Sequence, residues 1–185
     1  MHLMLIDPAL SALLVGVLAL MFAAAAIHKL RDLGQFAQIF ANYGLLPWVS
    51  RWHLSWCVPV LEVAVAVALL LPPTRLSAAS VAALLLSGYA AAMAINLHAG
   101  RTSLACGCGV ADQSQPIAAW MVARNLLLLP VLAFALCPSN ARALQWTDFM
   151  TVVLGVAVLA LLYASAERLL SLPSRQSLRA QGSTS

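Results

Sequence analysis

The chain has 185 residues, of which 63% are hydrophobic and only 9% are charged, and its formal net charge is +4. This composition excludes an ordinary soluble domain, in which about one residue in four is charged. Most Lys and Arg residues lie in expected loops and in the tail. In these places they indicate how the chain is oriented in the membrane and where it contacts lipid headgroups. We therefore expect a membrane protein with lipid around it and no nucleic-acid partner.

The first two elements differ in how their apolar residues are arranged. Residues 9–27 form an unbroken apolar run without charge, which is long enough to cross a hydrocarbon core of ~30 Å. Residues 33–46 instead place Phe36, Ile39 and Tyr43 at helical spacing. This pattern predicts an amphipathic helix that lies at the membrane interface.

The second and third spans are expected at residues 56–71 and 76–98. Pro59 would fall in the first turn of the second span, where a missing amide hydrogen is tolerated. Glu62 is harder to accommodate, because a carboxylate inside a membrane helix is costly and normally faces a partner, a cavity or a proton path.

A loop over residues 100–116 leads to a fourth span at 117–137 and a fifth at 149–166. The fourth span contains Arg124 and Asn125, which are costly in contact with lipid. These residues, like Glu62, should point into the bundle.

The expected fold class is therefore all-α: a polytopic membrane helix bundle with about five transmembrane helices and one interfacial helix. Residues 1–170 form this bundle, and residues 171–185 are expected to be a disordered basic tail.

Reactive side chains gather in one place, at Cys106-Gly107-Cys108-Gly109. Because glycine permits tight backbone turns, the two thiols can approach each other and cycle between dithiol and disulfide. A small ring of this kind should be comparatively easy to reduce. Two alternatives stay open: an inert structural pair, or half of a metal site that lacks its other ligands. We expect no metal and no other cofactor.

The other two cysteines should lie at opposite ends of the bundle. With alternating spans, Cys57 and Lys29 share the side of Cys106 and Cys108, whereas Cys137 ends the fourth span on the other side. Cys57 could relay a disulfide to the pair, although a free cysteine in a helix is more often a small buried side chain.

Three charged residues invite pairing. Glu62 and Arg124 lie at similar depth, so an ion pair between them would offset both desolvation costs, whether for structure or for function. Lys29 closes the first span, where extension of the side chain to water is the default and attraction to a nearby thiolate is the alternative.

Several of these residues together carry a family resemblance. They are His28-Lys29-Leu30, Tyr43-Gly44-Leu45-Leu46-Pro47, Pro59, Glu62, Cys106-Gly107-Cys108-Gly109 and Arg124-Asn125. In this arrangement the chain resembles the MauE family of methylamine utilisation membrane proteins, within the broader DoxX-like group. The resemblance covers most of the chain from the first to the fourth span.

The resemblance implies a role in maturation, processing or transport of the small (β) subunit of methylamine dehydrogenase. It also implies a thioredoxin-like periplasmic partner, MauD, and a location in the bacterial cytoplasmic membrane. On this basis Cys106 and Cys108 are the candidate redox residues, supported by Lys29, Cys57, Glu62, Arg124 and Asn125. A small transporter or export component, and a docking scaffold without redox activity, are the alternatives.

Charge and chemistry disagree about orientation. If five spans cross, seven Lys and Arg residues share the side of the cysteines and only Arg75 and Arg142 lie opposite. The positive-inside rule then places the cysteines in the cytoplasm, whereas the resemblance implies periplasmic chemistry.

Overall fold

A computed structural model describes residues 6–43, 51–102, 104, 116–140 and 142–182, with the backbone alone for 51–54 and 171–182. Among these residues the regular structure is helical, apart from one isolated bridge between Ile6 and Ser139. The helices are α1 (Pro8–Arg31), α2 (Leu33–Asn42), α3 (Arg51–Leu70), the short 3₁₀ helix η1 (Pro72–Thr74), α4 (Arg75–His98), α5 (Ala119–Ala135) and α6 (Trp146–Gly182).

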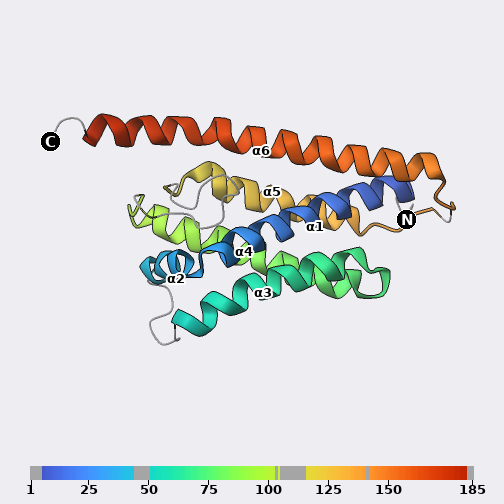
Figure 1. Cartoon of the computed structure of the whole chain (residues 1–185), viewed down its shortest axis with the longest axis horizontal. Helices are drawn as coiled ribbons and strands as arrows, with labels where there is room; N and C mark the ends of the chain where they lie inside the picture. Colours follow the sequence, from blue (N-terminus) through green and yellow to red (C-terminus); the bar gives the residue numbers. More distant parts are fainter. Residues whose placement is uncertain (1–5, 44–50, 103, 105–115, 141, 183–185) are drawn as a thin grey trace.

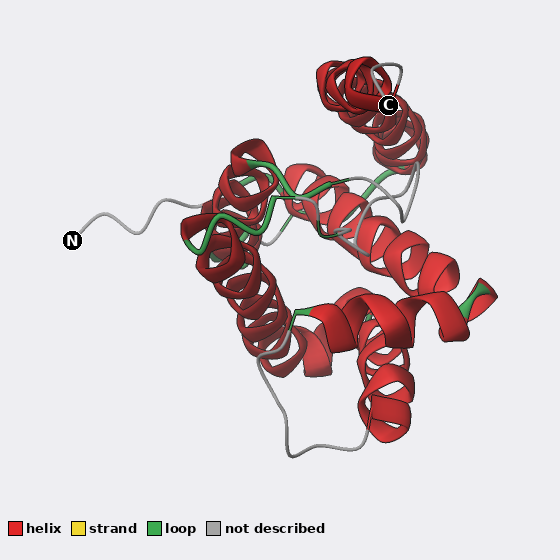
Figure 2. Ribbon diagram, turned by 90° about the vertical axis from the view of Figure 1, so that its left-hand side faces the viewer, coloured by secondary structure: helices red, strands yellow, loops and turns green. Residues whose placement is uncertain are grey.

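The long helices lie roughly along one common axis, and α2 lies at one end of the bundle that they form (Figure 1). Helix α1 packs against α3, α5 and α6, and α4 packs against α3 and α5. Helix α6 lies at the edge of the bundle, as the end-on view shows, and its C-terminal part extends beyond the other helices (Figures 1 and 2). Helix α1 therefore holds the bundle together.

Within the part of the chain that the structure describes, three helices are long and apolar enough to cross a membrane: Pro8–Arg31, Pro72–His98 and Trp146–Leu170. Two shorter apolar helices, Ser55–Leu70 and Ala119–Ala135, lie between them. The prediction of an all-α membrane helix bundle is confirmed, whereas the count of five crossing helices stays a prediction.

The core where α1, α3, α4 and α5 meet combines branched side chains with alanine. Leu18, Leu69 and Ala82 are fully buried there. Small residues let helix backbones approach closely. In a membrane the hydrophobic effect does not drive helices together, because lipid is itself apolar, so close packing of this kind has to stabilise the bundle. A second cluster, around Ile39 of α2 and Met121 of α5, seats α2 against the end of the bundle. The apolar face of α2 is thus turned toward protein.

Two boundaries differ from the sequence prediction. Helix α3 begins at Arg51, so Pro59 lies inside the helix and not in its first turn. Helix α6 continues to Gly182, through most of the segment for which composition predicts disorder. Leu, Arg, Gln and Ala together make up seven of the twelve residues from 171 to 182, and such residues extend an existing helix at low cost. The division into bundle and tail stays a prediction.

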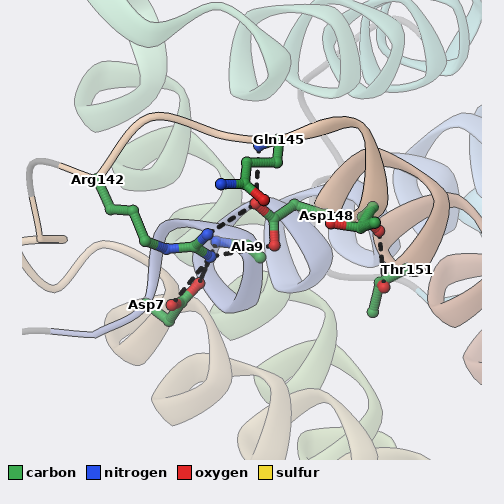
Figure 3. Close-up of polar contacts among 7 residues, drawn as sticks. Asp7, Ala9, Arg142, Gln145, Asp148 and Thr151 are labelled. Carbon is green, nitrogen blue, oxygen red and sulfur yellow. Dashed lines mark hydrogen bonds and ion pairs between the residues drawn. The ribbon is translucent and has the colours of Figure 1, made fainter.

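A polar clip ties the start of α1 to the start of α6 (Figure 3). The Arg142 guanidinium donates to Asp7 Oδ1 at 3.0 Å and to Asp148 Oδ2 at 2.8 Å. Asp7 also caps α1 by accepting a hydrogen bond from the Ala9 amide at 2.8 Å. This amide, and then Arg142, lower the pKa of Asp7 below its ordinary value of 3.8. The clip lies at the end of the bundle opposite α2.

Candidate functional site

A buried ion pair joins α1 to α3. Lys29 Nζ donates to Glu62 Oε1, and the two side chains are 2% and 0% exposed. The same Nζ lies 4.9 Å from the centroid of the Tyr89 ring and 5.6 Å from that of Phe36. The expectation that Lys29 extends to water is therefore wrong. Because α2 follows α1 after one residue and places Phe36 beside the ammonium group, the route to water is covered.

Helix α4 completes this group through a tyrosine. The Tyr89 hydroxyl donates to Glu62 Oε1 at 2.6 Å, and Lys29 Nζ lies 3.5 Å from the same hydroxyl oxygen. One carboxylate oxygen thus receives donors from two helices. A buried charge of this kind is tolerated only when it is paired and hydrogen-bonded.

A second ion pair joins α5 to α6. Arg124 Nη1 donates to Glu167 Oε1 at 2.9 Å, and the guanidinium carbon lies 5.7 Å from the centroid of the Trp120 ring. The predicted pair between Glu62 and Arg124 is therefore wrong. Each has a nearer partner of opposite charge, since Lys29 turns inward and the long helix α6 brings Glu167 to Arg124.

Both ion pairs border one cavity of about 50 Å³. Its polar lining comes from α1, α3, α4, α5 and α6: Lys29, Glu62, Tyr89, Arg124, Asn125 and Tyr163. The remaining lining is apolar, with Leu18, Phe22 and Leu128 among it. The prediction that Glu62, Arg124 and Asn125 point into the bundle is confirmed. Four predicted supporting residues, these three and Lys29, are thus brought together.

Cys106 and Cys108 lie outside the described residues. The two ends of the segment that contains them are described, and they meet: the Ile117 amide donates to the Leu104 carbonyl at 2.9 Å. This contact lies where α4 ends and α5 begins, at the end of the bundle that carries α2 (Figure 1). The described residues on either side of positions 105–115 therefore meet at one place.

The other two cysteines do not reach the cavity. Cys57 is exposed on α3. It lies about 140° around the helix axis from buried Glu62, because the two residues are five positions apart and each position rotates an α-helix by about 100°. Cys137 is half-buried just after α5, at the clip end of the bundle, and its thiol donates to the Ala133 carbonyl at 3.8 Å. Cys57 as a relay to the cysteine pair stays a prediction.

Three residues of this site were missed in the sequence: Tyr89, Tyr163 and Glu167. A tyrosine at position 89 stands out in a span otherwise rich in alanine and leucine. Tyr163 and Glu167 are four residues apart, so they share one helix face. This spacing would have indicated an inward polar face, had the last span been extended beyond residue 166.

The fold and the site define a membrane helix-bundle protein with a charge-balanced polar centre. The chain belongs to the MauE family: the model of the methylamine utilisation protein MauE matches residues 7–138. It is 39% identical over 160 residues, 86% of each chain, to the methylamine utilization protein MauE of Paracoccus denitrificans. The protein of that name from Paracoccus versutus is 38% identical over 171 residues, 91% of each chain.

A further relative, the MauE protein of Methylophilus methylotrophus, is 34% identical over 176 residues, which cover 94% of this chain and 93% of the relative. No solved structure matches the chain significantly. The resemblance seen in the sequence is therefore confirmed at the level of the family. Glu167 lies beyond the segment that the family model matches, so the second ion pair extends past that segment.

Proposed function

We propose that this protein acts in methylamine utilisation as an accessory protein. It lies in the bacterial cytoplasmic membrane, which the chain crosses several times. Its task is maturation, processing or transport of the methylamine dehydrogenase small (β) subunit, with a thioredoxin-like partner such as MauD. The printed names of the relatives support the methylamine system. The client, the partner and the wider DoxX-like relationship come from the resemblance in sequence.

The chemistry assigned to Cys106 and Cys108 is thiol–disulfide exchange. One thiolate attacks a disulfide sulfur of the partner, and the second thiol resolves the mixed disulfide. The disulfide and the dithiol then change places, so this step needs no external oxidant. The new disulfide of Cys106 and Cys108 then oxidises a dithiol of the client, so each disulfide formed in the β subunit reduces one disulfide of the partner to a dithiol.

One observation carries the proposal: the backbone contact between Leu104 and Ile117. It holds together Leu104 and Ile117, the described residues on either side of the cysteine segment. The bundle supplies a fixed base for these residues, because Leu104 packs against the cluster that includes Ile39 and Met121. Loops held by a rigid scaffold commonly carry functional residues.

The test replaces both thiols in cells that produce the client. We expect Cys106→Ser/Cys108→Ser to abolish accumulation of the mature β subunit, measured by immunoblot and by methylamine dehydrogenase activity. The level of the membrane protein should stay unchanged. Cys137→Ser is the matched control, since Cys137 lies at the opposite end of the bundle and should be dispensable. Normal client levels in the double serine variant would contradict the redox role.

The rival function, a transporter or export component, rests on Glu62, Arg124 and Pro130 within the helices. It predicts that Glu62→Gln abolishes function while the cysteine variants remain active. The cavity beside these residues, of about 50 Å³, is too small to hold a polypeptide. A docking scaffold predicts instead that neither change matters and that deletion of residues 36–48 does.

A further inference from the structure

Among the described residues that line the cavity, three carry a buried polar atom without a hydrogen-bond partner. These atoms are the acceptor Glu62 Oε2 and the donors Arg124 Nε and Asn125 Nδ2. All three residues line the same cavity, and Glu62 and Asn125 are 0% and 3% exposed. A buried polar atom left unpaired costs about 1–3 kcal/mol, so a cavity bordered by three of them calls for a ligand that can both donate and accept.

Size and charge narrow the choice of ligand. Lys29 and Glu62 balance one another, as do Arg124 and Glu167, so the cavity favours neither an anion nor a cation. Its volume of about 50 Å³ leaves room for about three to five water molecules, each of which needs about 10–15 Å³. Water also satisfies the need for a donor and an acceptor in one molecule.

We propose that this cavity is a hydrated proton-exchange site, in which bound water connects Glu62 Oε2 with Arg124 Nε and Asn125 Nδ2 and exchanges protons with the Glu62 carboxylate. The step moves one proton and no electrons. An O–H bond of protonated water breaks, and an O–H bond forms at Oε2. The other oxygen, Oε1, remains engaged by Lys29 and Tyr89.

Every helix around the cavity contributes a charged or titratable group. Helix α1 supplies Lys29, α3 supplies Glu62, α4 supplies Tyr89, α5 supplies Arg124, and α6 supplies Tyr163 together with the Glu167 that pairs with Arg124. The inference is independent of the thiol chemistry proposed above.

Infrared difference spectroscopy of the whole protein in lipid nanodiscs tests both parts. First, exchange from H₂O to D₂O should reveal stretching bands of internal water that are lost in Asn125→Leu. Second, acidification should produce the carbonyl stretch of a protonated carboxylic acid, absent in Glu62→Gln and shifted in frequency in Asn125→Leu. Asn96→Leu is the matched control, because Asn96 is equally buried but bonds the Ala92 carbonyl, away from the cavity.

If Asn125→Leu does not fold, Asn125→Ala provides the frequency shift of the carboxylic acid band, since it removes the amide. The water bands should then shift in frequency and not disappear, because alanine leaves more room for water. Two results would overturn the proposal. One is a wild-type spectrum without the water bands, or without the carboxylic acid band down to the acid limit of folding. The other is a stoichiometric lipophilic compound in solvent extracts of the wild type that is lost in Asn125→Leu, because the cavity would then hold that compound in place of water.

Discussion

At the scale of single residues, the Lys29–Glu62 pair stabilises the bundle only as long as both partners are present. Each charge loses its hydration on burial, and their mutual attraction offsets this loss. Removal of one partner leaves the other buried and uncompensated, which costs about 3–5 kcal/mol in comparable pairs. Replacement of both by neutral groups of similar size is often nearly neutral.

We therefore predict that Lys29→Met destabilises the protein by about 3–5 kcal/mol, because it leaves the Glu62 carboxylate without its cation. Thermal unfolding in detergent, followed by circular dichroism or by a tryptophan signal, measures the loss. The double variant Lys29→Met/Glu62→Gln should recover most of it, since glutamine still accepts the hydrogen bond from Tyr89. A double variant as unstable as the single one would show that the pair does not act as a unit.

Which residues point inward could be predicted from the sequence, but how they pair could not. Glu62 and Asn125 had to face protein, because lipid cannot hydrogen-bond them. Their partners depended on tertiary structure. Lys29 looked like a boundary residue until α2 covered it, and Glu167 lay beyond the last span that hydropathy marks.

At the scale of elements, apolar run length predicted the helices well and predicted their ends poorly. Hydropathy stops where polar residues begin, whereas the helices α3 and α6 continue through polar residues. This extension attaches α6 to the bundle at a second point. Glu167 pairs with Arg124 of α5, in addition to the clip at the start of α6. Between the anchors, Gly16 of α1 and Gly155 of α6 allow a close approach: a Cβ on Gly16 would lie 3.0 Å from Val156, and one on Gly155 2.7 Å from Leu13.

The clip that begins α1 and α6 should make stability depend on pH in acid. The pKa of Asp7 is lowered in the folded state, first by the Ala9 amide and then by Arg142. A carboxylate of this kind stabilises the fold above its unfolded pKa, near 3.8, and loses that contribution as the pH falls through the lower folded value. We expect Asp7→Asn to unfold at a lower temperature than wild type above about pH 5, with the difference vanishing in stronger acid.

The effect should be small, because the groups of the clip are exposed to solvent and screened by it. Thermal unfolding of both proteins over a series of pH values measures it. Asp32→Asn is the matched control, since Asp32 caps α2 at the opposite end of the bundle and has no Arg142 beside it. A difference between wild type and Asp7→Asn that grows toward low pH would contradict the argument.

At the scale of the whole molecule, the proposed function requires the end of the bundle that carries the cysteines to face the periplasm. The structure groups the described ends into two sets. The contact between Leu104 and Ile117, α2 and the C-terminal part of α6 lie at one end, and the clip with residues 138–140 lies at the other (Figure 1). Lys29 no longer counts as a topogenic charge, because it is buried with Glu62. The remaining bias, six Lys and Arg residues on the side of the cysteines against two on the other, still favours a cytoplasmic location for the cysteines.

Chemistry argues for the other orientation, and fusions decide between them. Disulfides persist in the periplasm and are rare in the cytoplasm, so the proposed function requires Cys106 and Cys108 outside. We predict that alkaline phosphatase, which is active only outside, is active when fused after Gly109 or after Arg179 and inactive when fused after Asn140. The first two fusions share one end of the bundle, so they should agree whatever the orientation. If only the fusion after Asn140 is active, the result agrees with the described fold but excludes thiol–disulfide exchange in the periplasm by this cysteine pair.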